Sequence, residues 1–218
     1  MNTLPSWAKQ ALGADGYDRI EVAIAKAENT TSGEIVPLLV RRSSTVGHVP
    51  ILAFAFVMLT AFIFDVPGLL ADVTGNEWIG AGLCWLLAAA LGFVASRFDI
   101  VDRILTPQPD QVHQVDMRAE LEFFELDLSQ TDGRTGVLLM VSLMEHRAVI
   151  LADKGISEKL DAEVWQEVVA LMIDGVKRGD LTGGMCAAIE RCGSLLATEF
   201  PLAEGDVNEL HDHLIVKN

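Results

Sequence analysis

The sequence predicts an α/β protein: a small mixed β-sheet flanked by helices (an α/β/α sandwich), interrupted by an inserted transmembrane helical hairpin. Three observations lead to this prediction. Two long uncharged runs, residues 49–64 and 79–96, lie close together in an acidic chain. Two apolar runs, 135–143 and 148–156, are joined by a short polar link, as in an antiparallel β-hairpin. Segments with helical spacing of apolar residues precede and follow that hairpin.

Length and composition limit the alternatives. The 218 residues have room for one domain with an appendage. The formal net charge is -15, yet half of the residues are hydrophobic and the mean hydropathy is positive, so apolar residues must be concentrated in part of the chain. Only 16 Lys and Arg residues stand against 31 acidic ones, which argues against a nucleic-acid partner. The cysteines Cys84, Cys186 and Cys192 show no disulfide framework and no metal-binding spacing.

The two uncharged runs predict membrane-spanning helices. The first run alone would extend roughly 24 Å as a helix, against about 30 Å of hydrocarbon in a bilayer, and a buried core helix would also explain it. A second such run changes the interpretation, because a small core has little room for two helices that are apolar on every face. Pro67, Gly68 and Gly75 predict a loop between them. We therefore expect a transmembrane helical hairpin over residues 46–98.

Basic residues predict the orientation of this hairpin. The short connecting loop has three acidic residues and no basic one, whereas arginines flank both runs on the other side. Because Lys and Arg are enriched in cytoplasmic loops, we expect a protein with two spans in the plasma (inner) membrane and both termini in the cytoplasm. The flanking arginines are Arg41, Arg42, Arg97 and Arg103.

Small residues recur at every fourth position of the second run and predict a helix-packing ridge. Such residues let helix backbones approach closely in lipid. The expected partner is the strip formed by Ala53, Val57 and Ala61 of the first run, or else a span of another protomer or of a partner protein. Composition is the alternative explanation, since Gly and Ala are common in membrane spans. The ridge consists of Gly80, Cys84, Ala88, Gly92 and Ser96.

The polar sequence on both sides, residues 1–45 and 99–218, is expected to form one discontinuous domain. We predict helices over 17–28, from Pro107 to about residue 126, over 162–177 and over 183–198. A strand is predicted over 34–40, where Pro37 indicates an edge strand or a bulge. Asp161 and Thr182 are the predicted N-caps of the last two helices. The polar tail, residues 204–218, is predicted to be loose.

Three segments of this polar sequence resemble the TPM domain family: TSGEIVPLLV, RTGVLLMVSLMEHRAVILADKGI, and KRGDLTGGMCAAIE followed by Phe200-Pro201. The similarity is greatest to the bacterial, membrane-anchored members with a transmembrane hairpin. The resemblance implies an α/β/α sandwich. It also implies weak acid phosphatase activity in some members, calcium binding in others, and association with LemA-type membrane proteins. At residues 152–155 this chain has ADKG, where many members have a Gly-Tyr-Gly-like turn.

Two groups of residues are candidate binding sites. Asp153, Asp161 and Asp180 stand in separate predicted loops and could provide oxygen ligands to Ca²⁺ or Mg²⁺. The simpler alternative is that Asp161 caps a helix, Asp180 belongs to a turn and Asp153 is solvated. The segment Thr182-Gly183-Gly184, at a predicted helix N-terminus, could hold an anion through backbone N–H groups, but its glycines could equally serve close packing.

The sequence favours a non-enzymatic function. Ser32 and Ser142 have no evident His and acid partners for a nucleophilic triad. We therefore expect a membrane-anchored accessory or assembly module for other membrane proteins. Its expected partners are the lipid bilayer together with a second copy of the chain, a LemA-type protein or a second TPM protein. The alternative is a weak acid phosphatase that depends on a divalent metal and acts at the membrane surface.

Overall fold

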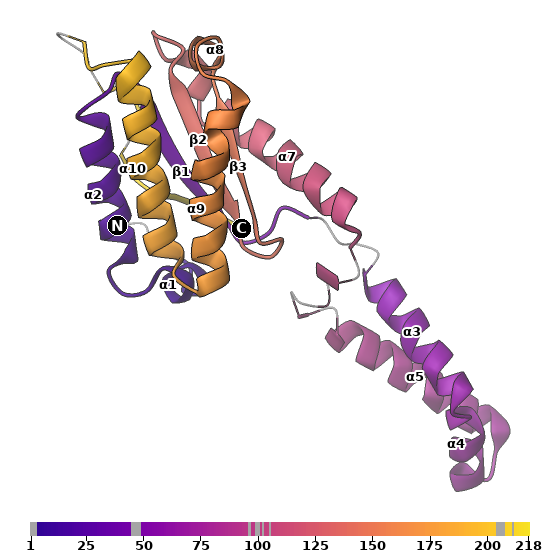
Figure 1. Cartoon of the computed structure of the whole chain (residues 1–218). Helices are drawn as coiled ribbons and strands as arrows, with labels where there is room; N and C mark the ends of the chain where they lie inside the picture. Colours follow the sequence, from indigo (N-terminus) through magenta and orange to yellow (C-terminus); the bar gives the residue numbers. More distant parts are fainter. Residues whose placement is uncertain are drawn as a thin grey trace. The chain divides into compact units, whose positions relative to one another are not determined.

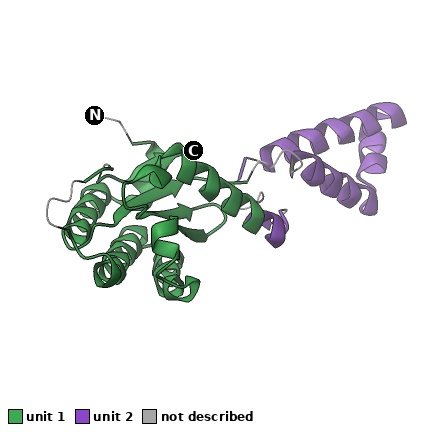
Figure 2. Cartoon of the chain, turned by 90° about the horizontal axis from the view of Figure 1, so that it is seen from above, with its two compact units in different colours: residues 1–44, 112–218 green, residues 45–111 purple. Residues whose placement is uncertain are grey.

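The computed structural model of the chain describes residues 4–44, 49–95, 97–98, 101, 103–104, 106–203, 208–210 and 212–218. The chain divides into two compact units (Figure 2). Unit 1 combines residues 1–44 with 112–218, and unit 2 consists of residues 45–111.

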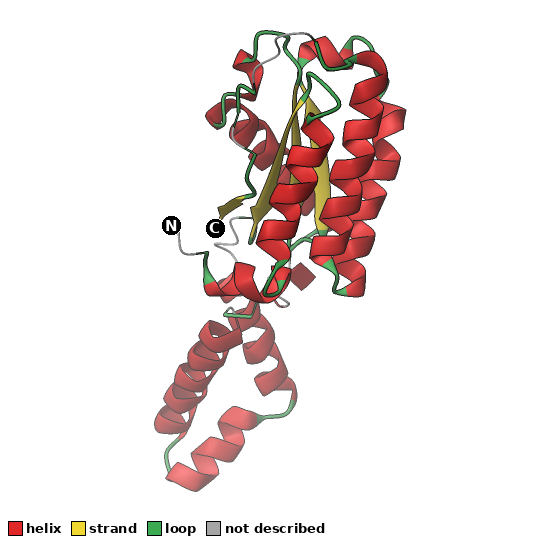
Figure 3. Ribbon diagram, turned by 90° about the vertical axis from the view of Figure 1, so that its left-hand side faces the viewer, coloured by secondary structure: helices red, strands yellow, loops and turns green. Residues whose placement is uncertain are grey.

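Unit 1 contains a four-stranded sheet in the order β3-β2-β1-β4 (Figures 1 and 3). β1 is parallel to β2 and to β4, whereas β2 and β3 form the predicted antiparallel hairpin. The sequence prediction of a small mixed sheet with helices is therefore confirmed.

The strands are β1 (Glu34–Val40), β2 (Gly136–Ser142), β3 (Arg147–Ala152) and β4 (Ile215–Lys217). The helices are α1 (Ser6–Leu12), α2 (Gly16–Glu28), α7 (Gln108–Glu125), α8 (Lys154–Ser157), α9 (Trp165–Arg178) and α10 (Leu181–Glu199), with the short 3₁₀ helices η1 (Leu128–Gln130) and η2 (Ala162–Val164).

Helices cover the two faces of the sheet. Because successive side chains of a strand point to opposite faces, β1 contributes Ile35 and Leu39 to one core and Val36 and Leu38 to the other. The first core contains α2, α9 and α10, and the second contains α7. Both β1 and β2 are buried along their whole length, in agreement with their nearly continuous apolar sequence.

Pro37 lies in an interior strand, but at a point where one side of that strand is open. The N–H of Ile35 points away from β2 and donates to Glu28 Oε1 at 2.8 Å. The missing N–H of Pro37 faces the same side, since N–H groups alternate along a strand. There β4 has not yet begun, because it pairs only with residues Leu38 to Val40. The prediction of an edge strand is thus wrong for β1, which lies between β2 and β4. Only the side of β1 next to Pro37 is unpaired, as an edge strand would be.

The end of the C-terminal tail, residues 214–218, is ordered, contrary to the prediction from sequence. Residues 215–217 form β4, and Leu214 is 2% exposed. The last residue, Asn218, accepts a hydrogen bond from Trp7 Nε1 at 2.8 Å. Three residues are too few to show strand periodicity, so this pairing had no local signal.

Neither predicted N-cap, Thr182 or Asp161, caps its helix through its side chain. Asp180, not Thr182, is the N-cap of α10, and its side chain accepts from Gly183 N at 3.0 Å. The hydroxyl of Thr182 instead donates to the carbonyl of Leu12 at 2.7 Å. Asp161 is the residue before η2, and its side chain forms no capping hydrogen bond.

The described part of unit 2 includes the helices α3 (Val49–Ile63), α4 (Val66–Thr74) and α5 (Glu77–Ala95). The segment predicted as a loop is therefore helical. Its signals are in the sequence: the Asp65 side chain accepts from Gly68 N, Pro67 stands in the first turn, and Gly75 ends the helix with a φ of 67°. The short helix was overlooked because those same residues also favour turns.

One helix of unit 2, α5, is long and apolar enough to cross a membrane, a criterion that core helices of soluble proteins also meet. It coincides with the second predicted span. The first predicted span corresponds to α3, which meets the criterion only together with α4, and the pair is bent by 70°.

The helix-packing ridge of α5 faces the other two helices of unit 2. Gly80, Cys84, Ala88 and Gly92 are buried, and Ser96 is outside the described residues. A Cβ atom on Gly92 would lie 3.0 Å from the backbone N of Phe54, and one on Gly80 would lie 2.5 Å from the backbone N of Ala71. Cys84 and Ala88 form one cluster with Met58 and Ala61. Ala53, in the strip expected to face this ridge, is also buried, and Val57 packs partly buried against the cluster.

These contacts predict that Gly80→Ala destabilises unit 2, by about 1–3 kcal/mol, because a backbone atom of α4 cannot move aside as a side chain can. Gly82→Ala is the matched control, since nothing lies within 4 Å of its Cβ position. The measurement is thermal unfolding of the chain in mild detergent, followed by tryptophan fluorescence. Equal melting of the two variants would show that the helices do not pack in this way.

Candidate functional site

Buried polar residues cluster at the carboxyl ends of the parallel strands β1 and β2. Glu145 lies in the turn between β2 and β3 and is 3% exposed. Its carboxylate accepts hydrogen bonds from Ser43 N at 3.1 Å, from Ser44 N at 2.8 Å and from Ser142 Oγ. The hydroxyls of Ser43 and Ser142 are 2.9 Å apart. This arrangement fixes the chain where it leaves β1.

A serine that donates to a carboxylate can take part in proton transfer. Ser142 is fully buried, however, and Glu145 already accepts two backbone N–H groups. The pair therefore serves to hold the chain. The sequence predicted no acid partner for Ser142, and Glu145 was missed. The available signal was a glutamate three residues later, within the turn of a buried hairpin.

Asp153, the first predicted metal ligand, is 5% exposed and engaged by internal donors. Its carboxylate accepts from Arg134 Nε at 2.6 Å and from Arg134 Nη2 at 3.0 Å. It also accepts from Lys154 N at 2.7 Å, which caps α8. Asp153 thus forms a two-pronged ion pair between the end of β3 and the start of β2.

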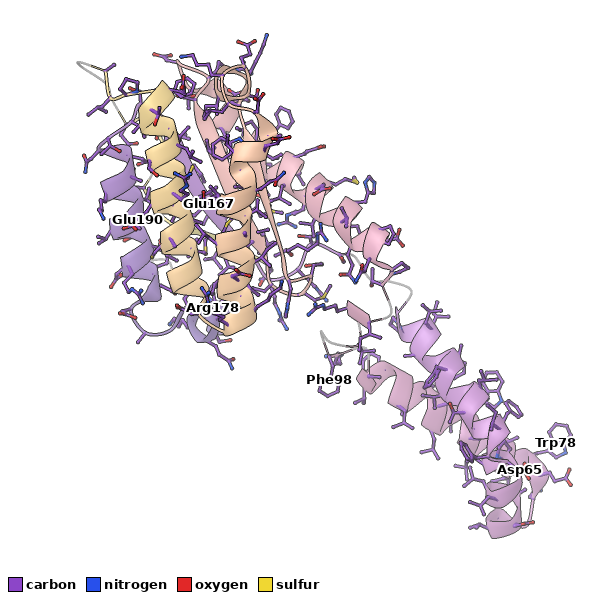
Figure 4. All side chains as sticks on the ribbon, in the orientation of Figure 1. Asp65, Trp78, Phe98, Glu167, Arg178 and Glu190 are labelled. Atoms are coloured by element: carbon purple, nitrogen blue, oxygen red, sulfur yellow. The ribbon has the colours of Figure 1, made fainter. Side chains whose placement is uncertain are left out.

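The structure does not bring Asp153, Asp161 and Asp180 together. Asp161 precedes η2 and α9, whereas Asp180 follows α9. The 14 residues of α9 separate them by roughly 21 Å along the helix, and Figure 4 shows Glu167 and Arg178 towards the two ends of that helix. Among the residues that the structure describes, no three His, Cys, Asp or Glu side chains are grouped so that they could hold a metal ion.

The predicted anion-binding segment takes part in capping and packing. The hydroxyl of Thr182 donates to the carbonyl of Leu12, and the N–H of Gly183 donates to the carboxylate of Asp180. Gly184 approaches Gly175 of α9 so closely that a Cβ on it would lie 2.7 Å from the Cα of Gly175. A carboxylate of the chain itself therefore stands where an anion would bind.

A second group of buried carboxyl groups lies at the open edge of β1. Glu28, the last residue of α2, accepts from Ile35 N, and Glu34 Oε1 accepts from Glu209 N at 3.0 Å. The second oxygens of Glu28 and Glu34 are buried and have no hydrogen-bond partner within the described residues. Asp212 of the tail interacts electrostatically with both. These carboxyl groups join α2, β1 and the C-terminal segment.

Burial makes these groups weak acids. Loss of solvation raises the pKa of Glu28 to about 9, an effect that the hydrogen bond from Ile35 opposes and that the charges of Asp212 and Glu34 reinforce. Burial also raises the pKa of Glu34. A protonated Glu28 can donate as well as accept a hydrogen bond. Glu28 was not among the residues predicted from the sequence; the available signal was its place four residues after the buried Ile24 on the apolar stripe of α2.

The raised pKa predicts a pH-dependent stability of unit 1. The pKa of Glu28 is about 9 in the folded chain and close to its ordinary value of about 4.3 after unfolding. The folded state therefore binds more protons across this window, and stability falls as the pH rises through it. Glu28→Gln keeps the acceptor for Ile35 without the ionisable acid, so the stability of this variant relative to the wild type should increase by about 4 kcal/mol between pH 5 and 8.

Urea unfolding at several pH values tests this prediction. The fluorescence of Trp7 and Trp165 reports on the unfolding of unit 1. Glu163→Gln, which removes an exposed carboxylate from η2, is the control and should keep a constant difference from the wild type. A pH-independent effect of Glu28→Gln would mean that Glu28 titrates normally.

Comparison with known proteins finds a match to one family model and a similarity to one solved structure. A family model described as the TPM domain matches residues 100–195. Among solved structures, the chain is similar to the BA42 protein of the psychrophilic bacterium Bizionia argentinensis, determined by NMR. The identity is 22% and the TM-score 0.57, over 94% of this chain and 95% of that chain. The comparison with curated proteins gave no match. The resemblance to the TPM domain inferred from the sequence is thereby confirmed over residues 100–195.

Proposed function

We propose that the chain is a membrane-anchored TPM-domain protein that serves as a non-enzymatic accessory or assembly module for other membrane proteins. The observation that carries the proposal is the packing of unit 2, where small residues face inward and large apolar residues face outward. Gly80, Cys84, Ala88 and Gly92 are buried. Exposed instead are Phe56 (70%), Phe62 (62%), Trp85 (56%), Leu86 (69%) and Leu91 (56%).

This packing suits lipid better than water. A soluble protein rarely exposes a large contiguous apolar patch. In lipid, apolar attraction does not drive helices together, and small residues at the interface give close contact instead. A core helix of a soluble protein would be mostly buried, whereas only 22% of the most apolar window of α5 is buried within the structure.

The helix lengths suggest how unit 2 enters a bilayer. The 19 residues of α5 extend roughly 28 Å, close to the thickness of the hydrocarbon region. The 15 residues of α3 extend roughly 22 Å, and the remaining depth would be filled by α4, beyond the 70° bend. We therefore propose one continuous span and one broken span.

The proposed orientation places both termini in the cytoplasm. The contact of Gly92 with Phe54 shows that α3 begins at the end of unit 2 where α5 finishes. In sequence, Arg97 and Arg103 follow the end of α5 and Arg41 and Arg42 precede the start of α3, whereas Asp65, Asp72 and Glu77 lie in or next to α4. Figure 4 shows Trp78 near Asp65, as expected for an aromatic residue at a membrane interface.

An accessory role is favoured over catalysis because the candidate catalytic groups are engaged inside the fold. Ser142 is fully buried, Asp153 is bound by Arg134, and the N–H of Gly183 is taken by Asp180. The proposed role requires neither Ca²⁺ nor Mg²⁺. It requires only that unit 1 be held at the membrane with a surface available to a partner.

Membrane anchoring predicts that the chain stays in the membrane fraction after alkaline carbonate extraction. The variant in which a Gly/Ser linker replaces residues 46–98 should appear in the soluble fraction and keep the far-UV circular dichroism of a folded α/β domain. Release of the full chain by carbonate would refute the anchoring.

The orientation predicts that Val73→Cys, at a position on α4 that is 80% exposed, reacts with a membrane-impermeant maleimide in intact cells. Asn218→Cys should react only after permeabilisation, and the wild type gives the background of the three native cysteines. Labelling of Asn218→Cys in intact cells would reverse the orientation.

A further inference from the structure

The outer face of α7 carries an exposed row of large apolar side chains. Met117, Leu121 and Phe124 are 55%, 52% and 68% exposed, whereas Val115 and Ala119 on the opposite side are fully buried against the sheet. Steps of four and three residues place the exposed side chains on one line along the helix. We call these three residues the α7 ridge. The helix itself is visible in Figure 1, on the face of the sheet away from α9 and α10.

The α7 ridge is more than scattered surface hydrophobicity. Single exposed apolar residues are normal on soluble domains, but a row with helical periodicity is typical of a helix that packs on two sides. The ring of Phe124 stands edge-on to the buried ring of Phe123, at a centroid distance of 6.2 Å and an interplanar angle of 87°. Phe124 nevertheless remains 68% exposed, so this edge contact leaves most of its side chain open to a partner.

Acidic residues border the ridge. Asp116 and Glu120 lie along one side, are exposed, and form no ion pair with any residue that the structure describes. On the other side, Arg118 is bound to Glu122 at 2.8 Å and Lys217 is bound to Glu125 at 3.0 Å. The basic groups beside the ridge are thus neutralised internally, and the unpaired charge there is negative.

We propose that the α7 ridge is a docking site for an amphipathic helix of a partner protein, whose apolar stripe is bordered by Lys and Arg. The apolar rows of the two helices would pack together, and the partner's basic residues would pair with Asp116 and Glu120. This inference rests on the proposed accessory function and gives that function a recognition surface.

The negative charge beside the α7 ridge favours a basic amphipathic helix over two other possible partners, an anionic bilayer and a second copy of the chain. An anionic bilayer surface would repel the carboxylates of Asp116 and Glu120. A second copy of the chain, related by a two-fold axis, would bring the same acidic border against itself. A basic amphipathic helix meets neither obstacle. Because three side chains make a small contact area, the complex is expected to be transient, with a dissociation constant on the order of micromolar, and to weaken with added salt.

The test uses two synthetic peptides, each about five helical turns long, that share a leucine stripe and differ only in its border of Lys or Glu. The full chain is reconstituted in phosphatidylcholine nanodiscs, and fluorescence anisotropy of the labelled peptides is measured, with empty nanodiscs subtracted. The Lys-bordered peptide should bind at least ten-fold more tightly than the Glu-bordered one.

Three variants locate the binding surface. Leu121→Ser combined with Phe124→Ser should weaken binding of the Lys-bordered peptide at least ten-fold. Val22→Ser removes an apolar side chain of α2 that is 67% exposed and should leave binding unchanged. Asp116→Lys combined with Glu120→Lys should invert the preference between the peptides. Circular dichroism melting confirms that each variant is folded.

Other outcomes overturn the proposal. Equal binding of the two peptides, or undiminished binding by the ridge variant, would show that the ridge does not select a basic helix. Failure of the Lys-bordered peptide to bind would show that another surface, such as unit 2 or a second copy, covers the ridge. Retention in the carbonate-washed membrane does not depend on these results, so failure of the docking site and failure of membrane anchoring can be told apart.

Discussion

Parallel pairing of β1 with β2 is the constraint on which the organisation of the chain depends. The chain leaves β1 at one end of the sheet and must return to the other end before β2 begins. Helix α7 makes that return, and unit 2, residues 45–111, lies between β1 and all but the first turn of α7 in sequence. The cost of closing so long a connection grows only slowly with its length. Glu145 binds the N–H groups of Ser43 and Ser44, so contacts within unit 1 are enough to fix the exit from β1.

Acidic side chains contribute to this fold as acceptors for backbone N–H groups. Glu28, Glu34, Glu145, Asp153 and Asp180 each accept at least one, at a strand edge, a loop or a helix N-terminus. A buried N–H without a partner costs on the order of 1–3 kcal/mol. Part of the acidic excess is therefore structural, and it joins segments that are far apart in sequence. The raised pKa of Glu28 is the cost of placing one such acceptor away from water.

Much of the fold could be predicted from local patterns, whereas the polar clusters could not. Periodicity indicated α2, α7, α10 and the β2–β3 hairpin, because each buries a regular set of side chains. The three residues of β4 and the helix α4 were missed, since one is too short for a pattern and the other begins with residues that also favour turns. The roles of Glu28 and Glu145 depend on partners 7 and about 100 positions away, and nothing in a single sequence specifies such partners.

The position of β4 has a consequence for synthesis of the protein on the ribosome. β1 ends at residue 40, but one of its neighbours, β2, begins at residue 136 and the other, β4, begins at residue 215. The sheet therefore cannot be completed until residue 217 has been synthesised. The apolar helices of unit 2 emerge before either neighbour of β1 exists. For the membrane-anchored protein proposed above, insertion of unit 2 into a bilayer would thus precede folding of unit 1, and β1 would have to remain unpaired in the meantime.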